Sequence, residues 1–166
     1  YTGEESKSKN YVVLALQDVD ERMRCEIEHT QHDMQLAAIV RSQYSVMNRV
    51  DLQSGSCERI NLNEYGGQEK TRKGDYSLHV ESALASHVHP QDVAAVRAVL
   101  SLDHLRRQAG TVEDFREENC QYRVRGPKEQ WLEEHVLYVR QGEQVLVNIL
   151  GRDITKEKQR EAENLR

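Results

Sequence analysis

Apolar and polar residues alternate in short blocks along the chain, and two of these blocks resemble each other. Residues 145–158 read VLVNILGRDITKEK, an apolar run that passes through Gly-Arg-Asp-Ile-Thr into a charged stretch. A weaker copy, YVVLALQDVDERMR, covers residues 11–24 and places Asp18 135 positions before Asp153. Such a repeat predicts the end of one module near residue 19 and a complete second module after it. A chance match is the alternative, because short apolar runs are common.

The pattern between the two copies predicts the first elements of the second module. Residues 20–42 contain neither Gly nor Pro and predict a helix. Two β-like runs follow at residues 43–52 and 57–62, joined by a turn that contains Gly55. Residues 63–74 are expected to form a loop. Asp75 is expected to cap a helix that reaches about residue 86, with Leu78, Ala83 and Leu84 as its apolar positions.

Short helices and long strands are expected in the rest of the chain. Pro90 ends the preceding helix, residues 91–100 form another, and Ser101 caps a last one that stops at Gly110. Three strands are expected at residues 112–125, 131–140 and 145–150, and their short polar links make them antiparallel. Strands and helices that do not alternate predict an α+β fold, here a five-stranded antiparallel sheet with short helices on one face.

The helix expected at residues 20–42 has a narrow apolar stripe. Its members recur at intervals of four and three residues, as in a coiled coil of about two heptads: Met23, Ile27, Thr30, Met34 and Ala37. A stripe with charged flanks suits packing against a second copy, and we therefore expect a homodimer. The alternative is an amphipathic helix that lies on its own domain.

Composition excludes several classes of function. The 166 residues have a net charge of −5, which gives no support for nucleic-acid binding, because that needs a clustered basic face. The longest apolar run, residues 11–16, is too short to cross a membrane, and we expect no direct membrane contact. Three cysteines without a CxxC pair favour free thiols and a cytoplasmic location. A parent protein anchored in a membrane is compatible with this expectation.

No group of residues predicts catalysis or a metal site. The sequence has no GxSxG, P-loop or HExxH motif, and we expect no enzyme activity in this chain. Its histidine pairs lack the further ligands that a metal needs. The pairs Glu117-Glu118 and Glu133-Glu134 lie on expected strands, where neighbouring side chains point to opposite faces, so neither forms a carboxylate dyad.

The order of elements, together with several short motifs, resembles a PAS domain of the bacterial sensory type. The matching segments are the hairpin at residues 44–60, the HPQD at 89–92, the strand pair at 122–125 and 131–133, and the RDITKEK at 152–158. The resemblance covers about residues 40–158 and departs from the family at residues 127–130, where Lys-Asp-Gly is usual. It implies the tail strand of a preceding PAS-like module at 1–19, a connecting helix at 20–42, a PAS domain at 43–153 and the start of an exit connector helix at 154–166.

The resemblance implies a sensory and signal-relay module of a larger bacterial signal-transduction protein. Its partners would be neighbouring PAS domains and an output domain, a histidine kinase or a diguanylate cyclase. The residues expected to relay the signal to the exit helix are Arg152, Asp153, Thr155, Trp131 and Glu133. Arg123 or Arg152 is expected as a charged partner of Asp153, and plain capping of the exit helix is the alternative role for Asp153 and Thr155.

The resemblance also implies a pocket for a small molecule between the sheet and the helices. The residues expected to line it are Met47, Leu84, Leu100, His104 and Tyr122. We predict no cofactor: His104 lies in a segment too charged for haem, and Asn119-Cys120 lies in a strand rather than opening a helix, as the flavin motif does. A ligand-free dimerisation and relay module is the alternative. We also expect a partner strand to cover residues 11–16, because a bare apolar edge promotes aggregation.

Overall fold

The computed structural model describes residues 31, 33–62 and 72–165. The first copy of the repeat, the boundary at residue 19 and the covering of residues 11–16 lie outside these residues. The chain divides into two compact units, Tyr1–Ser42 and Gln43–Arg166.

The described part of the first unit is helical. Residues 33–42 all have helical backbone, and the helix extends to residue 43. Of the predicted stripe, Met34 and Ala37 are exposed, whereas the other three members lie outside the described residues. Met34, Leu36 and Ile39 are among the most exposed large apolar side chains described, so within this unit the helix leaves apolar side chains uncovered.

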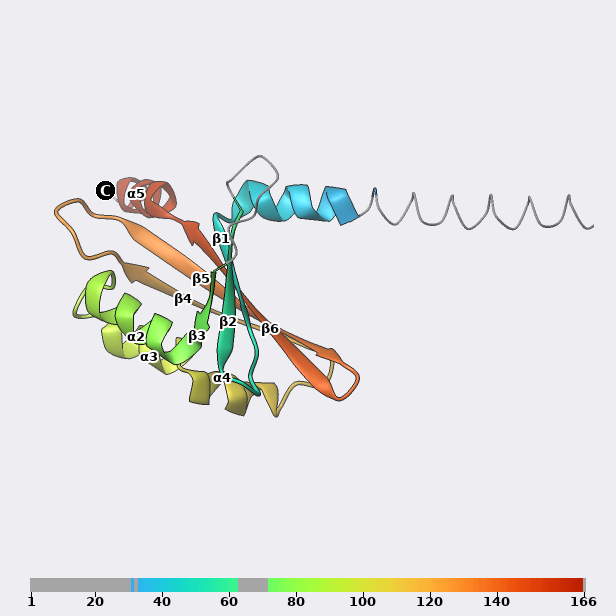
Figure 1. Ribbon diagram of the computed structural model, residues 1–166. Helices are drawn as coiled ribbons and strands as arrows, with labels where there is room; N and C mark the ends of the chain where they lie inside the picture. The colour runs from blue at the N-terminus through green and yellow to red at the C-terminus, as the bar shows by residue number, and fades with distance from the viewer. Residues whose placement is uncertain (1–30, 32, 63–71, 166) are drawn as a thin grey trace, which may run out of the picture. The chain divides into compact units, whose positions relative to one another are not determined.

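The second unit is α+β and contains an open antiparallel sheet (Figure 1). In sheet order, its strands are β3 (Arg72–Asp75), β2 (Ser56–Asn61), β1 (Val46–Val50), β6 (Gln144–Asp153), β5 (Trp131–Gln141) and β4 (Phe115–Arg123). The sequence predicts five strands, and the structure has six. The additional strand is β3, in a segment expected to be a loop. All four of its residues are exposed, so no apolar alternation marks it as a strand.

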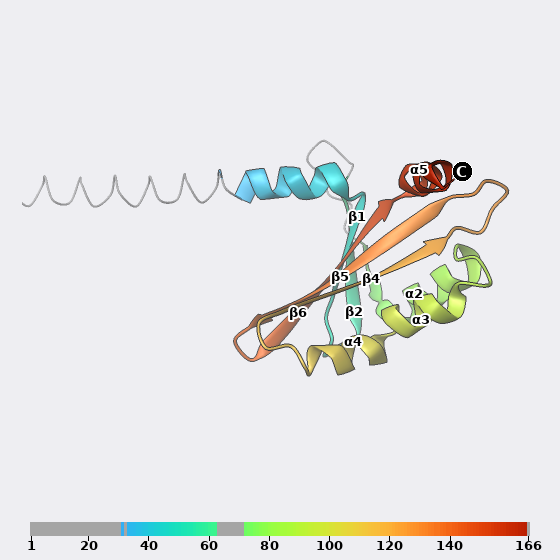
Figure 2. The same ribbon diagram turned by 180° about the vertical axis from the view of Figure 1, so that it is seen from behind.

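Three short helices cover one face of this sheet: α2 (Tyr76–Ser86), α3 (Val93–Leu100) and α4 (Leu102–Ala109) (Figures 1 and 2). The predicted caps are present, because Asp75 Oδ1 accepts from Leu78 N at 2.8 Å and Ser101 Oγ accepts from His104 N at 3.4 Å. Gly110 follows the end of α4, as predicted. A further helix, α5 (Thr155–Asn164), continues directly from β6.

The buried face of α2 differs from the prediction at one position. Leu78 is 73% exposed, whereas Tyr76, Val80 and Leu84 are buried. These three residues are spaced by four, and Asp75 fixes the start of the helix so that this row faces the sheet. Tyr76 is buried instead of Leu78, and its hydroxyl donates to Leu100 O at 2.7 Å.

The main core lies between the helices and the sheet. Val136, Tyr138 and Val147 alternate along β5 and β6 with residues that point to the other face, and none of the three is exposed. They pack in one cluster with Val96 of α3 and Leu105 of α4. The β1–β2 hairpin turns at Gly55 and the β5–β6 hairpin at Gly142. Both glycines have positive φ, as the sequence predicts for Gly55.

Candidate functional site

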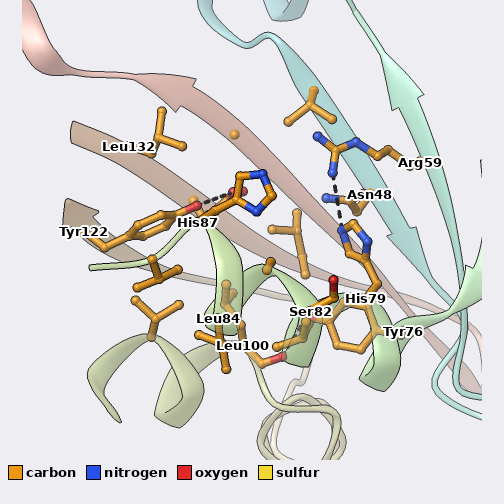
Figure 3. A pocket seen from close by; sticks show the side chains of 18 of the residues that line it. Asn48, Arg59, Tyr76, His79, Ser82, Leu84, His87, Leu100, Tyr122 and Leu132 are labelled. Carbon is orange, nitrogen blue, oxygen red and sulfur yellow. Dashed lines mark hydrogen bonds between the residues drawn. The ribbon is translucent and has the colours of Figure 1, made fainter. Parts of the chain in front are cut away.

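The core between the sheet and α2 and α3 is not completely filled. A cavity of about 440 Å³ remains there, within the range typical of small-molecule sites. Its apolar lining includes Val80, Leu84, Val88, Val96, Leu100 and Ile149. Its polar lining includes Asn48, Arg59, His79, His87, Tyr122 and Glu134. In Figure 3, the labelled side chains from the sheet and from α2 point into the same space.

Three of the five residues expected in the pocket line this cavity: Leu84, Leu100 and Tyr122. Met47 does not, because its neighbour Asn48 occupies the helix-facing position of β1 and Met47 points to the other face. His104 lies on α4, where its Nε2 is 3.0 Å from Glu118 Oε1. Since that carboxylate also accepts from a tyrosine hydroxyl, His104 belongs to a polar cluster outside the cavity.

Glu134 is the most distinctive polar residue of the cavity. Its Oε1 accepts from the Tyr122 hydroxyl at 3.3 Å, but its Oε2 is buried and has no hydrogen-bond partner. Burial raises the pKa of Glu134 to about 7, although the Tyr122 hydrogen bond and the nearby charge of Arg59 act in the opposite direction. A carboxyl group with a pKa near 7 inside a cavity is a common feature of functional sites.

Asn48 contributes a second buried acceptor. The residue is 7% exposed, and its Oδ1 has no hydrogen-bond partner. Beside it, at the next strand, Arg59 Nη1 lies 3.3 Å from His79 Nε2 (Figure 3). Burial and the charge of Arg59 lower the pKa of His79, which favours the neutral ring at pH 7. The cavity therefore combines an apolar body with two acceptors that lack donors.

The sequence pattern missed four polar residues of the cavity, which come from three strands and one helix: Asn48, Arg59, His79 and Glu134. Alternation along β5 predicts that Glu134 and Glu133 face opposite ways, but it does not say which of them faces the helices. Asn48 and Glu134 are 86 positions apart in the sequence and meet only through the strand order β1-β6-β5. That order depends on pairing between distant strands, which local patterns do not reveal.

The opposite face of β5 carries a different environment. Glu133 is 3% exposed, and its carboxylate accepts from Gln121 Nε2 at 2.7 Å and from Arg152 Nε at 2.6 Å. His135 Nε2 lies 2.8 Å from the same carboxylate. Burial opposes ionisation of Glu133, but these hydrogen bonds outweigh it and lower its pKa to about 2. The pKa values of these two adjacent glutamates are therefore shifted in opposite directions, each by the groups on its own side of the sheet.

The junction between β6 and α5 is bound to the start of β5. Asp153 Oδ1 accepts from Thr155 N at 2.8 Å, and Asp153 Oδ2 accepts from Gln130 Nε2 at 3.0 Å. Thr155 Oγ1 accepts from Trp131 N at 2.9 Å, and Ile154 N donates to Trp131 O at 2.9 Å. Trp131 thus exchanges hydrogen bonds with both residues that follow Asp153. The first turn of α5 is fixed to the strand that carries Glu134.

The predicted charged partner of Asp153 is wrong. Arg123 instead pairs with Asp92 at the start of α3, where Nη2 donates to Oδ1 at 2.7 Å and both N and Nε donate to Oδ2 at 2.9 Å. Arg152 pairs with Glu133. Asp153 already receives the backbone and amide donors described above, so its carboxylate acts as a cap for the exit helix.

Trp131 completes the junction with its side chain. Lys158 Nζ of α5 lies 5.5 Å from its ring centroid, and Arg123 Cζ lies 5.8 Å from the same point. Both distances are within the range of cation–π attraction. The residues expected to relay a signal therefore gather at one end of the β5–β6 pair, in two groups. Asp153, Thr155 and Trp131 contact one another, and Glu133 and Arg152 form the neighbouring ion pair.

Comparisons with known proteins provide no further guide. No protein-family model matches the chain, and no curated protein is significantly similar to it.

Among the described helices, none is long and apolar enough to cross a membrane. Over the same residues, no cluster of three or more His, Cys, Asp and Glu side chains could hold a metal ion. A functional assignment must therefore be argued from the cavity and the junction.

Proposed function

We propose that residues 43–153 form a PAS-like sensory module that binds a small molecule and relays its presence to the exit helix. One observation carries this proposal. The cavity of about 440 Å³ is lined by Gly151 and Arg152, the last residues of the chain before the junction that starts α5. A molecule in the cavity would touch the strand end that positions α5.

The relay has a short physical route. Glu134 and Leu132 of β5 line the cavity, and Leu132 is the register partner of Asp153. Trp131, which precedes Leu132 in β5, holds Ile154 and Thr155 at the start of α5: its backbone N–H donates to Thr155 Oγ1, and its backbone C=O accepts from Ile154 N. A displacement of β5 by a ligand therefore changes the support of the exit helix. Its output domain in the parent protein would be a histidine kinase or a diguanylate cyclase.

The test is to fill the cavity and measure α5. We expect Leu84→Trp, which places a large ring in the cavity, to alter hydrogen–deuterium exchange of the α5 amides. Leu78→Trp is the matched control, because Leu78 lies on the same helix and is 73% exposed. Native mass spectrometry of the purified chain should also find a small molecule bound to the wild type and to Leu78→Trp, but not to Leu84→Trp. Unchanged α5 exchange in Leu84→Trp, with equal native and denatured masses for the wild type, would contradict the proposal.

A second candidate is a dimerisation and relay module that needs no ligand. It is favoured by the apolar side chains that the helix at residues 33–43 leaves exposed: Met34 at 66%, Ile39 at 55% and Leu36 at 48%. Leu36 and Ile39, three positions apart, lie on the same side of the helix, and exposed apolar side chains of this kind mark surfaces that associate. This candidate predicts self-association together with an empty cavity, and the mass measurement above separates it from the first.

A further inference from the structure

The cavity has a chemical preference that follows from its unpaired groups. Glu134 Oε2 and Asn48 Oδ1 are buried acceptors without a hydrogen-bond partner, and both residues line the same space. A buried acceptor left without a donor is destabilising, and native proteins contain few of them. A ligand that fits this cavity must therefore supply hydrogen-bond donors. A carboxylate or phosphate ligand would bring only further acceptors to Glu134.

The carboxylate of Glu134 lies close to the backbone of the neighbouring strand. Glu134 pairs with Gly151 across β5 and β6, and a Cβ at residue 151 would lie 3.0 Å from Oε2 and 3.2 Å from Oε1. The same Cβ would lie 2.8 Å from Val46 Cγ1, so a side chain at residue 151 would displace both neighbours. The glycine allows the carboxylate to lie against the backbone of β6. The acceptor thus lies where only a glycine on the neighbouring strand leaves room for it.

Among the described residues, no cationic side chain forms an ion pair with this carboxylate. Of the two arginines in the lining, Arg59 is exposed and contacts His79, and Arg152 pairs with Glu133. Tyr122 provides one neutral donor to Oε1 and leaves Oε2 open. A buried carboxylate is best satisfied by a partner that supplies both a positive charge and an N–H group.

We propose that the cavity binds a small amine, whose ammonium group donates to Glu134 Oε2 and whose apolar body packs among the side chains of α2, α3 and β6. The body would contact Val80, Leu84, Leu100 and Ile149, which line the apolar part of the cavity. The Tyr122 hydroxyl already donates to Oε1, so the ammonium group would complete the hydrogen bonding of the carboxylate. Asn48 Oδ1 offers a second acceptor to the same molecule. This inference rests on the proposed function, since it names the ligand of that site.

The experiment compares three probes with one skeleton: 3-phenylpropylamine, 3-phenylpropan-1-ol and 3-phenylpropanoate. Each is titrated into the full chain while the amide NMR signals of the cavity residues are followed. Wild type, Glu134→Gln and the control Glu143→Gln are compared; Glu143 is an exposed carboxylate in the turn before β6. We expect the amine to bind the wild type and the control at least about tenfold more tightly than the alcohol, with the carboxylate weakest. Glu134→Gln should abolish the preference for the amine and leave the alcohol unchanged.

The outcomes separate this inference from the proposed function. If the alcohol or the carboxylate binds in the cavity as tightly as the amine, the amine assignment is wrong but a ligand site remains. The same conclusion holds if Glu134→Gln keeps the preference. If no probe binds the wild type, the amine assignment is again wrong, and the Leu84→Trp comparison alone decides the proposed function. The ranking in the wild type tests the assignment even if Glu134→Gln does not fold.

Discussion

At the scale of single residues, β5 shows how the two faces of one strand can set opposite properties. Glu133 and Glu134 are adjacent, yet the pKa of the first is about 2 and that of the second about 7. The difference arises from partners: Glu133 has charged and amide donors, whereas Glu134 has one tyrosine hydroxyl. Glu134 therefore changes its charge in the pH range in which proteins normally work.

Glu134→Gln should make the stability of the protein less dependent on pH. The folded-state pKa of about 7 lies above the ordinary value of 4.5, so the stabilising contribution of Glu134 is fully present below about pH 4.5. It is lost as the pH rises through 7, because the unfolded chain ionises more easily. A glutamine cannot ionise. We expect the variant to exceed the wild type in free energy of unfolding by about 3 kcal/mol at pH 8 and by less than about 1 kcal/mol at pH 5.

Denaturant unfolding at the two pH values measures this difference. Glu143→Gln, which removes an exposed carboxylate, should change stability little at either pH. An equal effect of Glu134→Gln at pH 5 and pH 8 would mean that Glu134 is not titrating inside the cavity.

At the scale of elements, the sequence predicts those that have a local signal, such as a turn glycine, a capping residue or an alternating strand. The structure contains the elements that have such a signal: the hairpin at Gly55, the caps Asp75 and Ser101 and the strands β4 to β6. β3 was missed because its four exposed residues pair through the backbone alone. Leu78 was misplaced because the start of α2, rather than hydrophobicity, decides which row faces the sheet. The same holds for the residues of the cavity. The sequence predicts apolar residues on its helices, but it does not predict the hydrogen-bond acceptors that distant strands contribute.

The element whose support is most local is α5. It has no buried residue of its own, and its first turn depends on the junction with β5. We expect Asp153→Ala to remove the cap from Thr155 N and to cost about 1 kcal/mol in helix stability, seen as faster hydrogen exchange in α5.

Asp51→Ala is the matched control for this change. Asp51 Oδ1 accepts from Gln53 N at 2.9 Å in the β1–β2 turn, so the control removes a similar side-chain contact far from α5 in the sequence. Its α5 exchange should equal that of the wild type. If Asp153→Ala leaves α5 exchange unchanged as well, then the two Trp131 hydrogen bonds alone hold the helix start.

At the scale of the whole molecule, the repeat in the sequence predicts more than the described residues can test. The second unit has the α+β class expected, with one strand more, but the preceding module falls among the residues outside the described part. Association is the property of the whole molecule that the exposed apolar side chains at residues 33–43 make testable.

Met34→Glu should weaken self-association. Met34 is 66% exposed in the single chain, and a carboxylate at this position would lose its hydration when two helices pack. Gln35→Glu adds the same charge one position away from the stripe and is the control. Sedimentation equilibrium at high micromolar concentration measures both variants. A wild type that is monomeric under these conditions would rule out the predicted dimer.

The junction at Trp131 has a practical consequence for every measurement on a variant that adds no second tryptophan. Trp131 is the only tryptophan of the chain, and both Arg123 of β4 and Lys158 of α5 hold a positive charge within about 6 Å of its ring centroid. Indole fluorescence responds to nearby charge and to water, so the emission of the unmodified protein reports on the contact between the sheet and its exit helix. No dye or label is needed to see whether this contact opens, and the spectrum can be recorded during any titration that uses no other tryptophan.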